Sequence, residues 1–360
     1  MLKAVGTGSS WRGRYGDRQT ENTGVMNTPA SSPASSVAPR ASRLLDRLVP
    51  VSPQWRIPAR KAERLGWLQL LLGVLVVVGA QMIVGLVAVA AGLVRLGAGG
   101  GAAARPGVAF IIAISAVPLA LLGYWLVVRF VGGRPVIELG GRGAALRELL
   151  VGLAMGALLM CAVIAVLALL GSYHVVDVGW STGILAGLQA GILAGFTEEI
   201  LVRGVMLRLI EGWVGTWWAL AVTAVFFGAA HLGNPQATVF GAVAIALEAG
   251  ILLGACYLLT RRLWLAIGVH AAWNFVQGGI FGSDISGTGS GRGLIEARFT
   301  GPNLLTGGAM GIEASVVAVV LCTAAGLVML LAVRRRGLVV PPCWRRPVLG
   351  EAVGDERSAG

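Results

Sequence analysis

Charged side chains are scarce in this sequence of 360 residues. Asp, Glu, Lys and Arg together account for 13%, while 56% of the residues are hydrophobic and the mean hydropathy is +0.78. Soluble globular domains carry about 25% charged residues, roughly twice the share found here. The composition therefore argues against a soluble domain and favours a protein that lies in a membrane.

Cysteine is also rare. Of the four cysteines, Cys161, Cys256 and Cys322 fall within apolar stretches and Cys343 lies near the C-terminal end. This arrangement excludes a disulfide framework and a paired CxxC metal site. No short apolar core with a cleavage site stands near the first residue, so we expect no signal peptide, and Met26 is a second candidate start.

The sequence is rich, by contrast, in long apolar runs. Each has about 18 residues or more, enough to cross a ~30 Å hydrocarbon layer as a helix. Eight are expected, at roughly 66–94, 107–128, 148–170, 181–210, 216–232, 237–259, 263–281 and 314–333. Barrel strands would show an alternating pattern, which is absent. The sequence therefore predicts an all-α, polytopic integral membrane protein with about eight transmembrane helices.

The net charge of +12 is unevenly distributed along the chain. Eleven of the 29 Lys and Arg residues precede the first predicted span and six follow the last. Others cluster in 129–147 and 261–262, whereas the alternate loops are poor in cations. This alternation is the positive-inside signature. It predicts a multi-pass protein of the cell membrane with both termini in the cytoplasm, and contact with membrane lipid rather than nucleic acid.

Composition divides the chain into six predicted regions. The segment TPASSPASSVAP (28–39) is rich in Ser, Pro and Ala without an apolar period, which predicts disorder. The regions are a disordered basic cytoplasmic N-terminal region (1–64), two transmembrane helices with a cytoplasmic loop (65–144), a helical core (145–281), a Gly-rich extracytoplasmic loop (282–312), the last transmembrane helix (313–333) and a basic cytoplasmic tail (334–360).

Three charges interrupt the fourth predicted span, in the sequence EEILVR (198–203). Charges in the middle of a bilayer cost at least ~2.5–3.5 kcal/mol each, so they usually mark a functional site. The preceding glycines repeat every fourth position from 183 to 195, a small-xxx-small pattern that suits a helix buried among others. Glu199 and Arg203 share a helical face and are expected to form an ion pair that fixes the site. Glu198 points about 100° away from Glu199 and is free to act.

Two of the three histidines also lie in apolar spans. Glu198 lies 16 residues before Val214 in a predicted helical hairpin, and His231 lies 17 residues after it. At 1.5 Å per residue both are about 24–26 Å from the turn, so antiparallel helices would bring them level. His270 and Asn274 are four residues apart and can face the same cavity. The spacing therefore permits a single site.

Three motifs on successive spans resemble those of one family. EEILVR (198–203) fits E-E-x-x-x-R, FGAAH (227–231) fits F-x-x-x-H, and HAAWN (270–274) fits H-x-x-x-N. In this order they resemble the CPBP family of intramembrane proteases. That family includes the type II CAAX prenyl endopeptidases and the bacterial Abi and bacteriocin-immunity proteins. The resemblance covers roughly 145–281 and implies a CPBP/Abi-type catalytic core.

The resemblance also implies roles for individual residues. Glu198 and His231 would activate a water molecule, as general acid–base groups do in peptide hydrolysis. His270 and Asn274 would stabilise the oxyanion of the tetrahedral intermediate. Phe227 is expected to be a packing residue.

The family has been described both as metalloproteases and as metal-free glutamate proteases, and the residues leave both open. Glu198, His231 and His270 would supply three ligands for a catalytic Zn²⁺ with one open position. However, no HExxH motif is present, and Asn274 is a poor Zn²⁺ ligand but a good amide donor. These two observations slightly favour the metal-free mechanism.

Two other functions fit parts of the sequence. A proton-coupled transporter would use the same intramembrane acids, with Glu248 as a relay or as a partner for Arg203, but no inverted repeat relates the two halves. A non-catalytic membrane scaffold of the same fold would not need the four site residues together. We therefore expect an endopeptidase. Its partner would be a membrane protein or lipidated peptide substrate, in CAAX-type processing or bacteriocin self-immunity, and the oligomeric state stays open.

Overall fold

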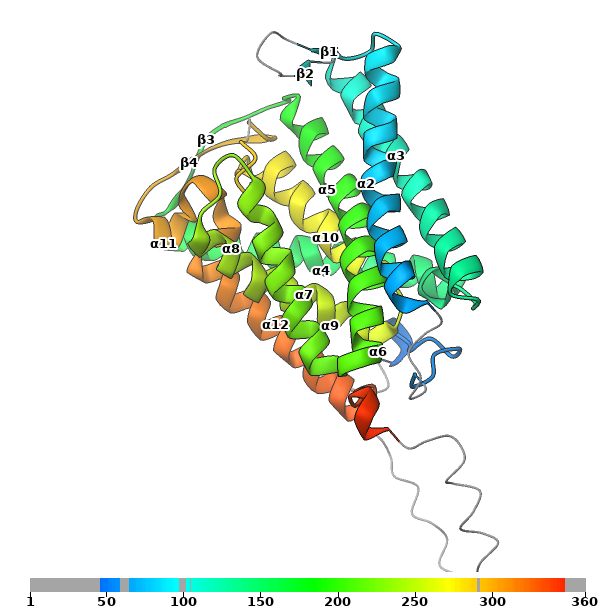
Figure 1. The fold of residues 1–360 in the computed structure, drawn as a ribbon. Coiled ribbons are helices and arrows are strands. Elements are labelled where there is room, and N and C mark those ends of the chain that lie inside the picture. Colours follow the sequence, from blue (N-terminus) through cyan, green and yellow to red (C-terminus); the bar gives the residue numbers. More distant parts are fainter. Residues whose placement is uncertain (1–45, 59–64, 97–101, 104, 290–291, 347–360) are drawn as a thin grey trace, which may run out of the picture. The chain divides into compact units, whose positions relative to one another are not determined.

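The structure is a computed structural model that describes residues 46–58, 65–96, 102–103, 105–289 and 292–346. The predicted disorder of the N-terminal region concerns mostly residues outside these ranges. The described residues are largely helical, and long helices run side by side (Figure 1). The predicted all-α, polytopic architecture is confirmed.

Seven helical stretches among the described residues are long and apolar enough to cross a membrane. Several are continued or interrupted by a π or 3-10 segment, labelled η. They are α2 (Gly66–Ala90), α3 (Pro106–Leu126) with η1 (Val127–Val131), α4 (Arg142–Leu169), α5 (Gly183–Glu199) with η3 (Ile200–Leu207) and α6 (Arg208–Val214), α7 (Thr216–Ala230) with η4 (His231–Gly233), α8 (Val239–Ile245) with η5 (Ala246–Gly250) and α9 (Ile251–Thr260), and α12 (Val316–Arg335).

The remaining predicted span, at 263–281, is the central helix of the bundle. It consists of α10 (Trp264–Asn274) and η6 (Phe275–Ile280), and all but one of the residues from Leu265 to Asn274 are buried. This stretch of 11 and 6 residues is shorter than the other spans. A helix surrounded by other helices need not match the full thickness of the bilayer by its own length.

Glycines let the helices beside α10 approach it closely. A Cβ atom at Gly191 or Gly195 of α5 would overlap Ala271, and one at Gly152 of α4 would overlap the carbonyl of Leu265. The small-xxx-small pattern of α5 predicted a helix buried among others, and its glycines do allow α5 to pack directly against α10. This contact brings EEILVR and HAAWN together.

Helix α4 begins at Arg142, six residues before the start predicted at 148. The reason lies in a pair that is distant in sequence. The Glu148 carboxylate is fully buried and accepts a hydrogen bond from Nε of Arg262 at 3.0 Å. Arg262 also donates to the carbonyl of Pro50 at 2.7 Å. Because Arg262 pairs with it, the charged Glu148 can lie within α4 instead of marking the start of the helix.

Both described terminal segments lie at the end of the bundle where α6 joins α7. Arg336 donates to the carbonyl of Val49 at 3.0 Å, and Arg346 donates to that of Pro58 at 3.0 Å. The tail also pairs with the start of α7. The amide of Thr216 donates to the carbonyl of Val340 at 3.0 Å, and the amide of Val340 donates to Oγ1 of Thr216 at 2.8 Å. We call this the termini end. Beside it lie η2 (Ile137–Leu139) and η9 (Cys343–Arg345).

The opposite end, which we call the loop end, carries the remaining connections. Strands β3 (Tyr173–Val178) and β4 (Ile295–Phe299) pair antiparallel there, with Tyr173 opposite Phe299. A second small ladder joins β1 (Arg95–Leu96) to β2 (Ala102–Ala103). The chain then reaches α12 through three short helical turns, α11 (Asn303–Thr306), η7 (Gly308–Met310) and η8 (Ile312–Ala314).

Candidate active site

The EEILVR segment lies where α5 passes into η3, in the middle of the longest membrane helix. Glu199 and Arg203 are fully buried, and Nη1 of Arg203 donates to Oε1 of Glu199 at 2.7 Å. The expected ion pair is therefore present. Nη2 of Arg203 donates to the carbonyl of Ala249 at 3.2 Å, which links the pair to η5. These additional bonds are what make a buried ion pair tolerable.

The same carboxylate also holds a histidine. Nδ1 of His270 lies 2.9 Å from Oε1 of Glu199, so this oxygen accepts from both His270 and Arg203. The other oxygen, Oε2, is buried without a hydrogen-bond partner in the described part of the chain. Glu199 thus fixes the orientation of the His270 ring.

Phe227 packs at the centre of these groups, as expected, and it does more than fill space. Its ring lies 4.6 Å from Cζ of Arg203, a cation–π distance. It also meets both histidines edge to face, with ring centroids 5.0 Å from His231 and 6.0 Å from His270. Phe227 therefore sets the spacing between the two imidazoles.

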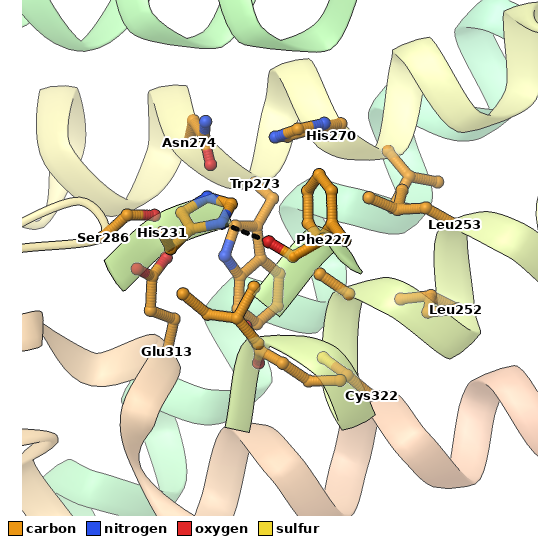
Figure 2. Close-up of a pocket in the computed structure, with 14 residues that line it drawn as sticks. Phe227, His231, Leu252, Leu253, His270, Trp273, Asn274, Ser286, Glu313 and Cys322 are labelled. Carbon is orange, nitrogen blue, oxygen red and sulfur yellow. Dashed lines mark hydrogen bonds between the residues drawn. The ribbon is translucent and has the colours of Figure 1, made fainter. Parts of the chain in front are cut away.

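His231 is oriented by the backbone of its own helix. Nδ1 lies 2.7 Å from the carbonyl oxygen of Phe227 (dashed line in Figure 2). Because a carbonyl only accepts, Nδ1 carries the proton of the neutral imidazole. Nε2 is then left with a lone pair and can accept a proton from water.

The predicted site residues meet in one open cavity of about 1050 Å³, which we call the outer cavity. Glu198, His231, His270 and Asn274 all line it, although they come from three different spans. Glu198 is half-buried and has no hydrogen-bond or ion-pair partner among the described residues. The structure therefore keeps one carboxylate paired, at Glu199, and leaves the neighbouring one unpaired.

A second cavity of about 410 Å³ lies behind the histidines, and we call it the inner chamber (Figure 2). It shares His231, His270 and Asn274 with the outer cavity and adds two acids, Glu248 and Glu313. Both are nearly fully buried, and each has one carboxyl oxygen without a hydrogen-bond partner among the described residues.

The suggested pairing of Glu248 with Arg203 is wrong. Arg203 directs one guanidinium nitrogen to Glu199 and another to the carbonyls of η5, so Glu248 is not its partner. The reason is geometric. Glu248 lines the inner chamber, whereas Arg203 does not line it and stacks on the ring of Phe227.

Sequence reasoning missed Glu313 as part of the site. In Figure 2 its carboxylate points toward Ser286 and the His231 ring. It is carried by η8, whose backbone is held where the amide of Ile312 donates to Oγ of Ser283 at 3.2 Å. The one signal in the sequence is an acid at the edge of the last apolar run.

The Zn²⁺ ligand set considered from the sequence is not formed. Across the described ranges, no three His, Cys, Asp or Glu side chains are grouped so that they could hold a metal ion. Glu198, His231 and His270 share the outer cavity, but they do not form such a group among the described residues. The residues as placed do not fit the ion, and we derive no step through it.

Comparison with known proteins gives one match. Residues 179–276 match the family model described as type II CAAX prenyl endopeptidase Rce1-like, over less than half of the chain. The match contains all three motifs and supports a protease. No curated protein and no solved structure matches the chain. The resemblance to type II CAAX prenyl endopeptidases that was stated from the motifs is confirmed for residues 179–276, which include Glu198, His231, His270 and Asn274.

Proposed function

We propose that this protein is an intramembrane endopeptidase that hydrolyses a peptide bond of a membrane-associated protein or peptide. One observation carries the proposal. A single cavity is lined by an unpaired carboxylate, a histidine with a free Nε2 and two further polar side chains, all at membrane depth. Intramembrane ionisable groups are costly unless they serve a function.

In the first step, Glu198 accepts a proton from a water molecule held between its carboxylate and Nε2 of His231. The water oxygen attacks the carbonyl carbon, and the carbonyl oxygen becomes an oxyanion. A general base at hydrogen-bond distance accelerates such a step by about 10²–10⁴-fold. The apolar surroundings, including Leu201 and Phe226, exclude competing bulk water.

The oxyanion is bound by Asn274 and His270. The amide nitrogen of Asn274 donates directly. His270 can donate from Nε2 only if Nδ1 and Nε2 both carry protons, since Nδ1 is directed at Glu199. The Glu199 carboxylate stabilises that imidazolium, and Arg203 holds Glu199 in place. The intermediate then collapses: the C–N bond breaks, and the proton taken from water passes from Glu198 to the leaving amine.

Glu313 acts through His231 from the inner chamber. Its carboxylate points toward the ring from within the inner chamber (Figure 2). A carboxyl group there stabilises the partial positive charge that the His231 ring takes on as its Nε2 accepts a hydrogen bond from the attacking water. Glu313 is therefore a positioning residue that acts through the imidazole, since it lines the inner chamber and not the outer cavity.

The test compares the termini of membrane proteins, by mass spectrometry, in cells that express wild type or Glu198→Gln at equal levels. Termini that vanish in the variant are expected, and they identify the substrate. Glu296→Gln is the matched control, because Glu296 is exposed on β4 at the loop end. Identical termini in wild type and Glu198→Gln, with both proteins folded, would favour a scaffold or a carrier instead.

A further inference from the structure

The two ends of the bundle differ in free positive charge. Six exposed arginines at the termini end have no ion-pair partner among the described residues: Arg47, Arg129, Arg142, Arg334, Arg335 and Arg345. At the loop end, Arg105 and Arg298 are exposed without an ion-pair partner among the described residues, whereas Arg292 is neutralised by Asp177 at 2.5 Å and by Glu296 at 3.2 Å. Arg292 lowers the pKa of the Asp177 carboxyl, which keeps that acid charged. Cations in excess are retained on the cytoplasmic side.

The mouth of the outer cavity lies at the loop end. Asn234, Ile285, Ser286 and Thr288 line it, and all four belong to connections at that end. These connections are held together where Nδ2 of Asn234 donates to the carbonyl of Ser286 at 2.6 Å. Thr288 is exposed. A path thus leads from the loop end past Thr288 to Glu198.

The other direction is filled by side chains. Below Glu198, on the way to the termini end, stand the buried Arg203 and Leu207. Tyr124 closes the space beside them, and its hydroxyl donates to the carbonyl of Gly204 at 3.1 Å. A Cβ at Gly204 would already press on the Tyr124 ring. The site therefore has a packed floor toward the termini end and a polar mouth toward the loop end.

We infer that the outer cavity is entered from the extracytoplasmic side, so that the substrate is a membrane-bound polypeptide cleaved within an internal segment near the outer membrane surface. The side of entry follows from the cavity and the charges alone, whereas the substrate class rests on the proposed function. This differs from a lipidated C-terminus presented from the cytoplasm, which would have to reach Glu198 through the packed floor.

The lining of the cavity agrees with an internal segment. Among the described residues that line it, Glu198 is the only acidic residue, and no Lys or Arg is present. A free C-terminal carboxylate would find no Lys or Arg there and would face Glu198 as a like charge. An extended internal segment instead offers amides, which suit the neutral side chains of Gln81, Asn234 and Thr288.

The side of entry is tested by labelling cysteines in cells bounded by a single membrane, with a membrane-impermeant maleimide. Native Cys343 reports the termini end, and Thr288→Cys reports the mouth. Cys161 is replaced by Ala because it is exposed, whereas Cys256 and Cys322 are buried and stay. We expect Thr288→Cys to react in intact cells and Cys343 to react only after permeabilisation.

Other labelling patterns overturn the inference. Reaction of Cys343 in intact cells, or of both cysteines from the same side, contradicts the assigned orientation. If Thr288→Cys reacts in neither state, Asn303→Cys, exposed at the loop end, reports the side. Labelling of Asn303→Cys in intact cells would then confirm that the loop end is extracytoplasmic. It would contradict the inference that the substrate enters the outer cavity past Thr288.

The substrate class is tested separately by the position of the Glu198-dependent termini. Termini within extracytoplasmic or outer-surface segments are expected. Termini at cytoplasmic C-terminal peptides would overturn the substrate class while leaving the proposed protease intact. If labelling gives the expected pattern but no terminus depends on Glu198, the proposed function fails and the side of entry stands.

Discussion

The outer cavity and the inner chamber meet at one wall, which His231, His270 and Asn274 build together. On the outer side stands Glu198, half-buried and without a partner in the described chain. On the inner side stand Glu248 and Glu313, which are only 2% and 3% exposed. Carboxylates with different access to water on two faces of one histidine wall can take different roles. In the proposed mechanism, Glu198 accepts the proton of the attacking water. Glu313 acts on that step only through His231, and Glu248 contributes to stability.

The largest expected effect is that of Glu198→Gln. The amide keeps the size of the side chain but cannot accept the proton of water, so we expect cleavage to fall by about 10²–10⁴-fold. The rate of appearance of the Glu198-dependent terminus measures this. Cleavage at the wild-type rate would place the base elsewhere and remove the distinction between the two faces.

Arg203→Met should chiefly affect stability. It leaves Glu199 buried with His270 as its remaining partner, and breaking a buried pair costs about 3–5 kcal/mol. Thermal unfolding in detergent measures the loss. Arg298→Met is the control, because Arg298 is exposed on β4. An equal melting temperature for the two variants would mean that the pair does not brace the wall.

Asn274→Ala tests the wall from the substrate side. Removing one oxyanion donor lowers kcat by about 10²–10³-fold, and KM should change little. Steady-state kinetics on a peptide that contains the mapped cleavage site separate the two constants. A raised KM with unchanged kcat would show that Asn274 binds the ground state instead of the oxyanion.

Glu313→Gln and Glu248→Gln form a matched pair inside the inner chamber. We expect Glu313→Gln to lower kcat by about tenfold, or about 1.4 kcal/mol, without raising KM, because it replaces the carboxyl group behind His231 with an amide. Glu248→Gln should change kcat by less than about twofold. The reverse order would assign the role behind the histidine to Glu248.

The smallest effect is expected at the mouth of the outer cavity. Helix α2 carries two glutamines: Gln69 is buried, whereas Gln81 is exposed and lines the cavity. Gln81→Leu removes about one neutral hydrogen bond to the substrate, so KM should rise about two- to tenfold with kcat unchanged. Met82→Leu, one position further on the exposed surface of α2, should leave both constants unchanged. Equal kinetics for wild type and Gln81→Leu would remove Gln81 from the path of the substrate.

Much of the site follows from local sequence rules. The ion pair of Glu199 and Arg203 is a consequence of four-residue spacing on a helix, and the hairpin spacing brought Glu198 level with His231. The positions of Glu248 and Glu313 in the inner chamber did not follow from such rules. Glu313 lies 82 residues beyond His231 in the chain, and only the return of the last connection through η8 brings the two together.

By itself, the sequence determined that the chain crosses a membrane several times and that one helix carries an unpaired acid beside a paired one. Apolar length and helical periodicity are local properties, and the bilayer leaves the backbone few other ways to span. Only the tertiary structure decided which residues share a cavity. It gave Glu199 to His270 as a second partner, separated the outer cavity from the inner chamber, and directed the mouth to the loop end. These depend on how helices pack against α10, and that packing joins residues far apart in the chain.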